Sequence, residues 1–296
     1  MEAIKSQLKA NRPSLSHASI KTYSSVLNSL YKNVFEGKEG IDIEDFKAQQ
    51  EPILKYLEGL PSNKSKTILS ALYVLTESPV YRDLMLLHID KYNTTIKKQV
   101  KSDKLKANWI TKDDIKSKVD ELRNAANLLY KKKYWTTTDY QTLQNYILMV
   151  LYSGLYIPPR RAMDYIDFKI RGAIDRDNDN YLDKSHLVFN KYKTSKVYDT
   201  QKVKIPSSLK TILNKWIDRN PTDYLLFDNK KQPLNGTKLN QRINKIFDGK
   251  QVGVNGMRKS YLSNKYGHTI ELEKTMKEDF EKMGSSTLQK NHYIKK

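Results

Sequence analysis

The most apolar run in the chain, residues 146–156, is followed by two consecutive prolines, and this junction constrains the fold more than any other stretch. Pro158 and Pro159 lack backbone N–H groups and fix φ, so a helix over the apolar run has to end before them. The residue before each proline also favours extended geometry. The chain therefore leaves a buried helix through a stiff turn, which delivers Arg160 and Arg161 beside the core.

Asp164 lies three residues beyond Arg161. On a helical turn, that spacing lets a carboxylate orient a guanidinium through a charge-assisted hydrogen bond. Arg160 has Met163 at the same spacing, so we expect Asp164 to hold Arg161 and Arg160 to make an ordinary supporting contact. Taken alone, the stretch is more typical of a surface arginine pair, and the rest of the chain has to decide its role.

The net charge of +20 indicates a polyanionic partner, either nucleic acid or an acidic membrane surface. Residues 106–296 carry +16 of it. No apolar run approaches the roughly 18 residues of a membrane span, and the first residues lack the apolar core of a signal peptide. These observations favour nucleic acid over a membrane as the partner of an intracellular protein.

No cofactor or metal is expected. The chain has no cysteine, which excludes disulfides and thiolate zinc sites, and its five histidines are scattered. Residues 175–180 are acidic like a calcium-binding loop, but the sixth position is Asn180 instead of glycine and the twelfth is His186 instead of glutamate. This segment is predicted to be a polar turn.

Residues 1–96 are predicted to form a helical domain of four short helices. Apolar residues recur at helical spacing over 20–34, 53–57, 68–75 and 81–89. Residues 97–107 are a basic linker, which is a solvated tether and is also suited to contact a phosphate backbone. The lysines expected to bind DNA there are Lys97, Lys98, Lys101, Lys104 and Lys106.

Residues 108–296 are predicted to form a second, α+β domain. Thr111 and the segment beginning at Thr136 are placed to cap two helices, the second of which contains the apolar run. Residues 186–192 and 201–205 are predicted to be two strands that flank a polar turn containing Lys193. Pro206 opens a further helix, and the pattern from Lys238 onward is mostly helical. The predicted fold is mainly α with a small β-hairpin.

Four places in the second domain carry candidate catalytic residues: Arg161, Lys193, Arg258 and Tyr293. Their order resembles that of the tyrosine recombinases, the phage-integrase-like enzymes that break and rejoin DNA. In that family the first arginine follows a Gly-Leu segment, the lysine lies in a β-hairpin, and the second arginine ends a His-x-x-Arg box. The nucleophilic tyrosine follows a Met-Gly-His-Ser-like segment, as Tyr293 follows residues 283–286.

The resemblance implies a two-domain DNA clamp, in which residues 1–96 are the core-binding domain. Two positions depart from the family pattern: Asn255 replaces the box histidine, and Ser285 replaces a later histidine or tryptophan. Both positions normally support binding of the scissile phosphate. The residues predicted to support catalysis or to bind the phosphate are Arg160, Asp164, Asn255 and Ser285.

The chemistry explains these residue types. A tyrosine hydroxyl titrates near pH 10 and needs activation before it attacks. Two guanidiniums stabilise the charge that develops on the phosphate oxygens, and Lys193 is expected to protonate the leaving 5′ oxygen. The resemblance implies cleavage and rejoining of double-stranded DNA through a 3′-phosphotyrosyl link, in integration or recombination of a viral or mobile element, by a dimer or tetramer. It also implies that the protein acts where the DNA is, in the cytoplasm or nucleus of a host or in a virion. The alternatives are a type IB topoisomerase and a non-catalytic DNA-binding protein of the same fold.

Overall fold

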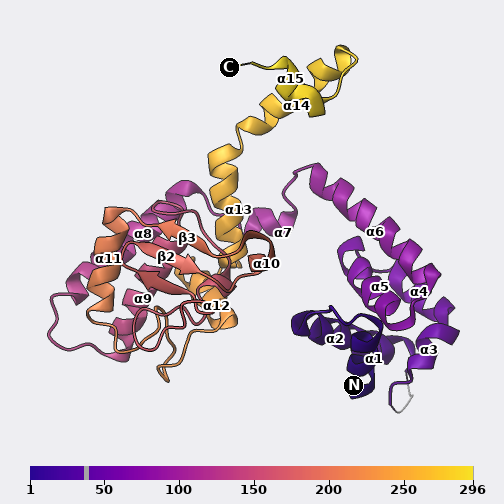
Figure 1. The fold of residues 1–296 in the computed structure, drawn as a ribbon, viewed down its shortest axis with the longest axis horizontal. Coiled ribbons are helices and arrows are strands. Elements are labelled where there is room, and N and C mark those ends of the chain that lie inside the picture. The colour runs from indigo at the N-terminus through magenta and orange to yellow at the C-terminus, as the bar shows by residue number, and fades with distance from the viewer. Residues whose placement is uncertain (37–39, 296) are drawn as a thin grey trace. The chain divides into compact units, whose positions relative to one another are not determined.

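The computed structural model describes residues 1–36 and 40–295, and the chain divides into two compact units between Lys101 and Ser102. This division falls within the predicted linker, residues 97–107. The linker differs from a plain tether because Asp103–Ala107 form a short helix, α7 (Figure 1). The Ser102 hydroxyl accepts a hydrogen bond from a backbone N–H of this helix and caps it.

Six helices build the described part of the first unit. They are α1 (Glu2–Asn11), α2 (His17–Val34), α3 (Ile43–Ala48), α4 (Gln50–Glu58), α5 (Ser62–Thr76) and α6 (Pro79–Lys97). The four predicted helices correspond to α2, α4, α5 and α6 and are confirmed. Helices α1 and α3 were not predicted, because α1 buries only Ile4 and Leu8 and α3 buries only Phe46, too few residues to show a periodic pattern.

The core of the first unit lies around α5, which packs against α1, α2, α3 and α6. Leu69, Leu72 and Leu75 of α5 are fully or almost fully buried. The side chain of Tyr81 is also buried, and its hydroxyl donates to the backbone oxygen of Phe46 at 2.7 Å. This bond satisfies a polar group that would otherwise destabilise the core.

After α7, the second unit continues with two helices whose predicted N-terminal caps are confirmed. Helix α8 spans Lys112–Leu129 and α9 spans Thr137–Tyr152. The hydroxyl of Thr111 accepts from the N–H of Asp114, and the Asp114 carboxylate accepts from the N–H of Thr111. Thr136 and Asp139 form the same reciprocal pair at the start of α9. Each capping box satisfies two backbone donors that a helix start leaves free.

Helix α9 is the centre of the second unit. Every residue from Tyr146 to Tyr152 is buried, because α9 contacts α8, α11, α12 and α13. The later helices of the unit are α11 (Ser207–Ile217), α12 (Gly236–Ile246) and α13 (Gly253–Tyr266). The apolar run therefore forms a core helix surrounded by other helices, as expected.

A three-stranded antiparallel sheet, in the order β1-β2-β3, packs onto this core (Figure 1). Its strands are β1 (Tyr181–Asp183), β2 (His186–Phe189) and β3 (Gln201–Lys204). The predicted hairpin corresponds to β2 and β3, in which Phe189 pairs with Gln201. Strand β1 was not predicted, since three residues are too few to alternate recognisably. The turn that contains Lys193 continues into a short helix, α10 (Ser195–Tyr198).

The C-terminal segment consists of α14 (Thr269–Lys282), a 3₁₀ turn η2 (Thr287–Gln289) and α15 (Lys290–Tyr293). Phe280 of α14 is buried, yet it belongs to neither of the two hydrophobic cores found among the described residues. Its ring instead packs edge-on against Tyr293, with 5.8 Å between the ring centroids. The segment 269–293, named the tail below, therefore packs largely on itself.

In the parts of the chain that the structure describes, no helix combines the length and the apolar composition that crossing a bilayer requires.

Candidate active site

The turn after α9 contains a glycine that holds it against α13. Gly154 has φ +75°, a left-handed conformation that favours glycine. A Cβ at this position would lie 2.2 Å from Cδ2 of Tyr261, a residue of α13. The absence of a side chain lets the Tyr261 ring pack directly on the turn. Helix α13 also carries Arg258, so this contact fixes Arg258 relative to the turn that leads to Arg160.

Gly154→Ala is expected to destabilise the protein by more than the roughly 1–3 kcal/mol that a strained left-handed residue costs, because the Tyr261 ring has to move as well. Urea denaturation measures the change in the free energy of unfolding. Gly249→Ala is the matched control, since Gly249 has φ +86° and a methyl group added there would meet only open space. Equal losses in the two variants would show that the contact between Gly154 and Tyr261 contributes nothing.

Beyond this turn, a cavity of about 510 Å³ is lined by three arginines and one carboxylate. Arg160, Arg161 and Asp164 come from the turn and the 3₁₀ segment η1 (Ala162–Asp164), and Arg258 comes from α13. Residues from the β2–β3 connection and from β3 complete the wall. This cavity is named the arginine pocket. Its excess of positive charge makes it suited to an anion with several oxygens, such as a phosphodiester.

Arg160 is the most firmly held of the three arginines. Its Nε donates to Oδ2 of Asp164 at 2.8 Å, and its Nη1 donates to Oε1 of Gln201 at 2.7 Å. The guanidinium also lies over the Phe189 ring, 3.9 Å from the ring centroid. Two hydrogen bonds and a ring contact fix both the position and the plane of the group, as bidentate recognition of a phosphate requires.

The predicted pairing of Asp164 with Arg161 is wrong, because Asp164 binds Arg160. Arg161 has extended backbone geometry (φ −72°, ψ 154°) and precedes η1, so the two residues do not share a helical turn. The i,i+4 pair of Arg160 and Asp164 closes instead. Within residues 1–36 and 40–295, Arg161 has no ion-pair partner, and its side chain lines the pocket half-buried.

The structure does not place the other predicted catalytic residues in this pocket. Lys193 is exposed and does not line it, although the neighbouring residues Tyr192 and Thr194 do. Asn255 lies one turn before Arg258 on α13, where it is exposed and also outside the lining.

Ser285 and Tyr293 belong to the tail. The Ser285 hydroxyl donates to Oε1 of Gln289 at 3.2 Å. Tyr293 is half-exposed and contacts the rings of Phe280 and His292. Neither Ser285 nor Tyr293 is among the residues that line the arginine pocket. The structure thus brings together the arginines and Asp164, but not the proposed nucleophile.

Four tyrosines lie in or behind the pocket. Tyr152 and Tyr165 are fully buried, and burial raises the pKa of both hydroxyls well above the ordinary value. The hydroxyl of Tyr192 donates to the backbone oxygen of Asp199 at 2.7 Å. Tyr198 lines the pocket and its side chain is exposed. The geometry of the pocket therefore indicates Tyr198 as the reactive tyrosine, whereas the sequence indicates Tyr293.

Gln201 and Tyr198 are among the pocket residues that sequence reasoning missed. Gln201 begins β3, and Val203, two residues later, lines the same pocket. Residues two apart in a strand face the same side. The predicted strand 201–205 therefore contained the signal that Gln201 and Val203 share a face. Nothing in the sequence indicated that this face would turn towards the arginines.

The lysines of the predicted DNA-binding linker are exposed. Lys97 ends α6, Lys98 is its C-cap, and Lys104 and Lys106 lie on α7, after Lys101. Lys106 pairs with Asp103 at 3.2 Å, but both side chains are largely exposed, so this pair contributes little.

Comparison with known proteins gave two structural similarities. No family model matches the chain, and no curated protein matches it. A crystal structure of XerA recombinase is 12% identical over 88% of this chain and 82% of that one, with a TM-score of 0.35. The XerH site-specific recombinase bound to difH substrate, in a pre-cleavage complex, is 14% identical over 90% and 84%, with a TM-score of 0.42.

Proposed function

We propose that the chain is a tyrosine recombinase that cleaves and rejoins DNA strands, in the integration or recombination of a viral or mobile element. The observation that carries this proposal is the convergence of Arg160, Arg161 and Arg258 on one pocket. Its carboxylate, Asp164, is buried and already paired, so it repels an entering phosphate less than a free carboxylate would. The order of candidate residues along the chain, which resembles the recombinase pattern, supports the same assignment.

In the proposed reaction, Arg160 and Arg258 bind the non-bridging oxygens of the scissile phosphate. The exposed hydroxyl of Tyr293 gives its proton to solvent water and attacks phosphorus, and the bond from phosphorus to the 5′ oxygen breaks. Lys193 gives its proton to that oxygen, which leaves a free 5′ hydroxyl and a 3′-phosphotyrosyl link. Rejoining reverses these steps and requires no cofactor or metal. The step requires Tyr293 to leave the ring of Phe280 and to reach the arginine pocket.

A suicide DNA substrate, from which the cleaved fragment diffuses away, tests the proposal. An enzyme of this kind accumulates a covalent protein–DNA adduct that survives denaturation. Strand exchange between two target sites then separates a recombinase from a type IB topoisomerase, which relaxes supercoiled plasmid without exchange.

A second candidate is a non-catalytic DNA-binding protein on the same scaffold. The positions of Tyr293 and Lys193 outside the pocket favour it. Tight duplex binding without any adduct would establish this candidate and contradict the first.

DNA binding is expected to weaken steeply with salt, because residues 106–296 carry a net +16 and the linker lysines are exposed. Six phosphate contacts give a log–log slope of roughly −5 on duplex DNA. Fluorescence anisotropy with a labelled duplex at several salt concentrations measures this slope. A slope near zero would show that nucleic acid is not the partner.

We also propose that both units contact the duplex, as the two halves of a clamp do. The protein would act inside the cell or virion that holds the DNA.

We propose further that the protein self-associates on DNA as a dimer or tetramer, and that the tail contributes to the contact with a second copy. Leu272 and Leu288 are 70% and 92% exposed, although leucine is usually buried. Sedimentation velocity with bound DNA is expected to show a species larger than a monomer, which Leu272→Glu weakens. A monomer at all concentrations would contradict self-association.

A further inference from the structure

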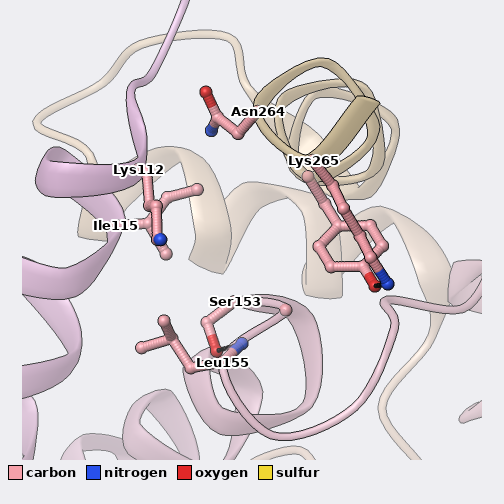
Figure 2. A pocket seen from close by; sticks show the side chains of 8 residues that line it. Lys112, Ile115, Ser153, Leu155, Asn264 and Lys265 are labelled. Atoms are coloured by element: carbon pink, nitrogen blue, oxygen red, sulfur yellow. Dashed lines mark hydrogen bonds between the residues drawn. The ribbon is translucent and has the colours of Figure 1, made fainter. Parts of the chain in front are cut away.

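A second cavity, of about 250 Å³, lies at the junction of three elements of the second unit. Figure 2 shows the labelled side chains around a common space, contributed by α8, by the end of α9 with its turn, and by α13. They are Lys112, Ile115, Ser153, Leu155, Asn264 and Lys265. This cavity, named the second pocket, contains none of the residues assigned to catalysis.

The charge of the second pocket is positive. Lys112 and Lys265 line it, and none of the aspartates and glutamates in residues 1–36 and 40–295 does. Hydrogen bonds with Tyr266 and Tyr261 raise the pKa of Lys265 above its ordinary value. Nζ of Lys265 donates to the Tyr261 hydroxyl at 3.3 Å. Two cations without a carboxylate favour an anionic ligand.

Two polar side chains of the second pocket, Ser153 and Asn264, each have a hydrogen-bond donor that is available to a ligand. Ser153 Oγ already accepts from the N–H of Leu155 at 3.2 Å, so its hydroxyl hydrogen is available to a ligand. Asn264 uses Nδ2 to donate to the Ser260 hydroxyl at 3.1 Å, and a second hydrogen remains on that nitrogen. A ligand that offers several acceptor oxygens and a negative charge matches this set, and a phosphate group has both properties.

Two segments of the chain contribute residues to both pockets: helix α13 and the turn after α9. Arg258 lines the arginine pocket, whereas Tyr261 and Lys265 line the second pocket. Separations of three and seven residues place all three on one face of α13, about 4.5 and 10.5 Å along its axis. The turn that contributes Ser153 and Leu155 leads within a few residues to Arg160. A strand held by its phosphate in the arginine pocket therefore has neighbouring phosphates within reach.

We propose that the second pocket binds a non-scissile backbone phosphate of the same DNA strand. This inference rests on the proposed function for the identity of the ligand, but its chemistry rests on the second pocket alone. Because α13 and the Gly154 turn form walls of both pockets, a phosphate bound in the second pocket positions the strand for the arginines. Lys112 and Lys265 are thus positioning residues for DNA cleavage.

The first measurement uses inorganic phosphate. At constant ionic strength, phosphate is expected to shift the backbone amide resonances of Gly154 and Leu155 saturably. The shift should disappear in the double variant Lys112→Gln/Lys265→Gln and persist in Lys210→Gln/Lys245→Gln, a control that loses the same charge from exposed positions on α11 and α12. Absence of a saturable shift in the unmodified protein would overturn the proposal.

The second measurement uses a labelled duplex. The pocket variant is expected to lower the magnitude of the log–log salt slope by about 0.9, the value of one phosphate contact, whereas the control variant keeps the slope of the unmodified protein. A saturable phosphate shift with an unchanged slope would assign the second pocket to a free phosphate compound and overturn the DNA assignment. If the unmodified protein shows no salt-dependent DNA binding, the proposed function fails, and the DNA assignment fails with it. The phosphate titration then shows whether the anion site itself exists.

Discussion

Tyr293→Phe is expected to abolish covalent DNA capture while leaving duplex affinity nearly unchanged. The hydroxyl oxygen of Tyr293 is the proposed nucleophile, and phenylalanine has no atom that can replace it. Duplex affinity depends instead on many phosphate contacts, of which this hydroxyl is at most one. Denaturing electrophoresis of a suicide-substrate reaction measures the adduct, and anisotropy with the same DNA measures the affinity.

Tyr198→Phe is the matched control, because Tyr198 is a tyrosine that lines the arginine pocket and is 64% exposed. If Tyr293 is the nucleophile, Tyr198→Phe retains adduct formation. The reverse result, a full adduct with Tyr293→Phe and none with Tyr198→Phe, would move the nucleophile to α10. It would also show that the order of residues along the chain was misleading about this group.

The helical framework was largely predictable because its signals are local. Thr111 and Thr136 each precede an aspartate at the capping-box spacing, and both caps form. The apolar run before Pro158 had to be buried, and helix α9 is the core of the second unit. The short apolar run 187–189 and the segment 201–205, on either side of a polar turn, are enough to identify the hairpin. Each of these signals depends on a few neighbouring residues and not on contacts between distant parts of the chain.

The site was less predictable because its geometry depends on local backbone detail and on distant partners. Whether Asp164 pairs with the residue three or four positions earlier depends on the backbone at Arg161, which is extended and not helical. The second partner of Arg160, Gln201, is 41 residues away on β3. The packing of Tyr293 on Phe280 similarly depends on how the tail folds onto itself. Spacing in the sequence fixes none of these contacts.

The contacts of Arg160 determine which arginine should matter most for cleavage. Arg160→Ala is expected to lower the single-turnover cleavage rate on the order of 10²–10³-fold, the loss typical of one donor that stabilises transition-state charge. Arg161→Ala is expected mainly to weaken binding, because nothing in the described structure fixes the plane of its guanidinium. Arg160→Lys should also cleave poorly, since an ammonium cannot match a planar fork held by Asp164 and Gln201. Rates at saturating protein decide between the two arginines.

A loss of stability has to be separated from this loss of chemistry. The carboxylate of Asp164 is buried, and its Oδ1 has no hydrogen-bond partner among the described residues. Removing Arg160 alone leaves a buried charge unpaired, which costs about 3–5 kcal/mol. The double variant Arg160→Ala/Asp164→Ala removes that charge as well. It is expected to recover much of the free energy of unfolding and to remain defective in cleavage, because the phosphate still lacks its guanidinium.

Recovery of cleavage together with stability would show that Arg160 acts only through the fold. If Arg160→Ala cleaves normally and Arg161→Ala does not cleave, then Arg161 is the catalytic arginine. The ion pair of Arg160 and Asp164 would then only stabilise the fold.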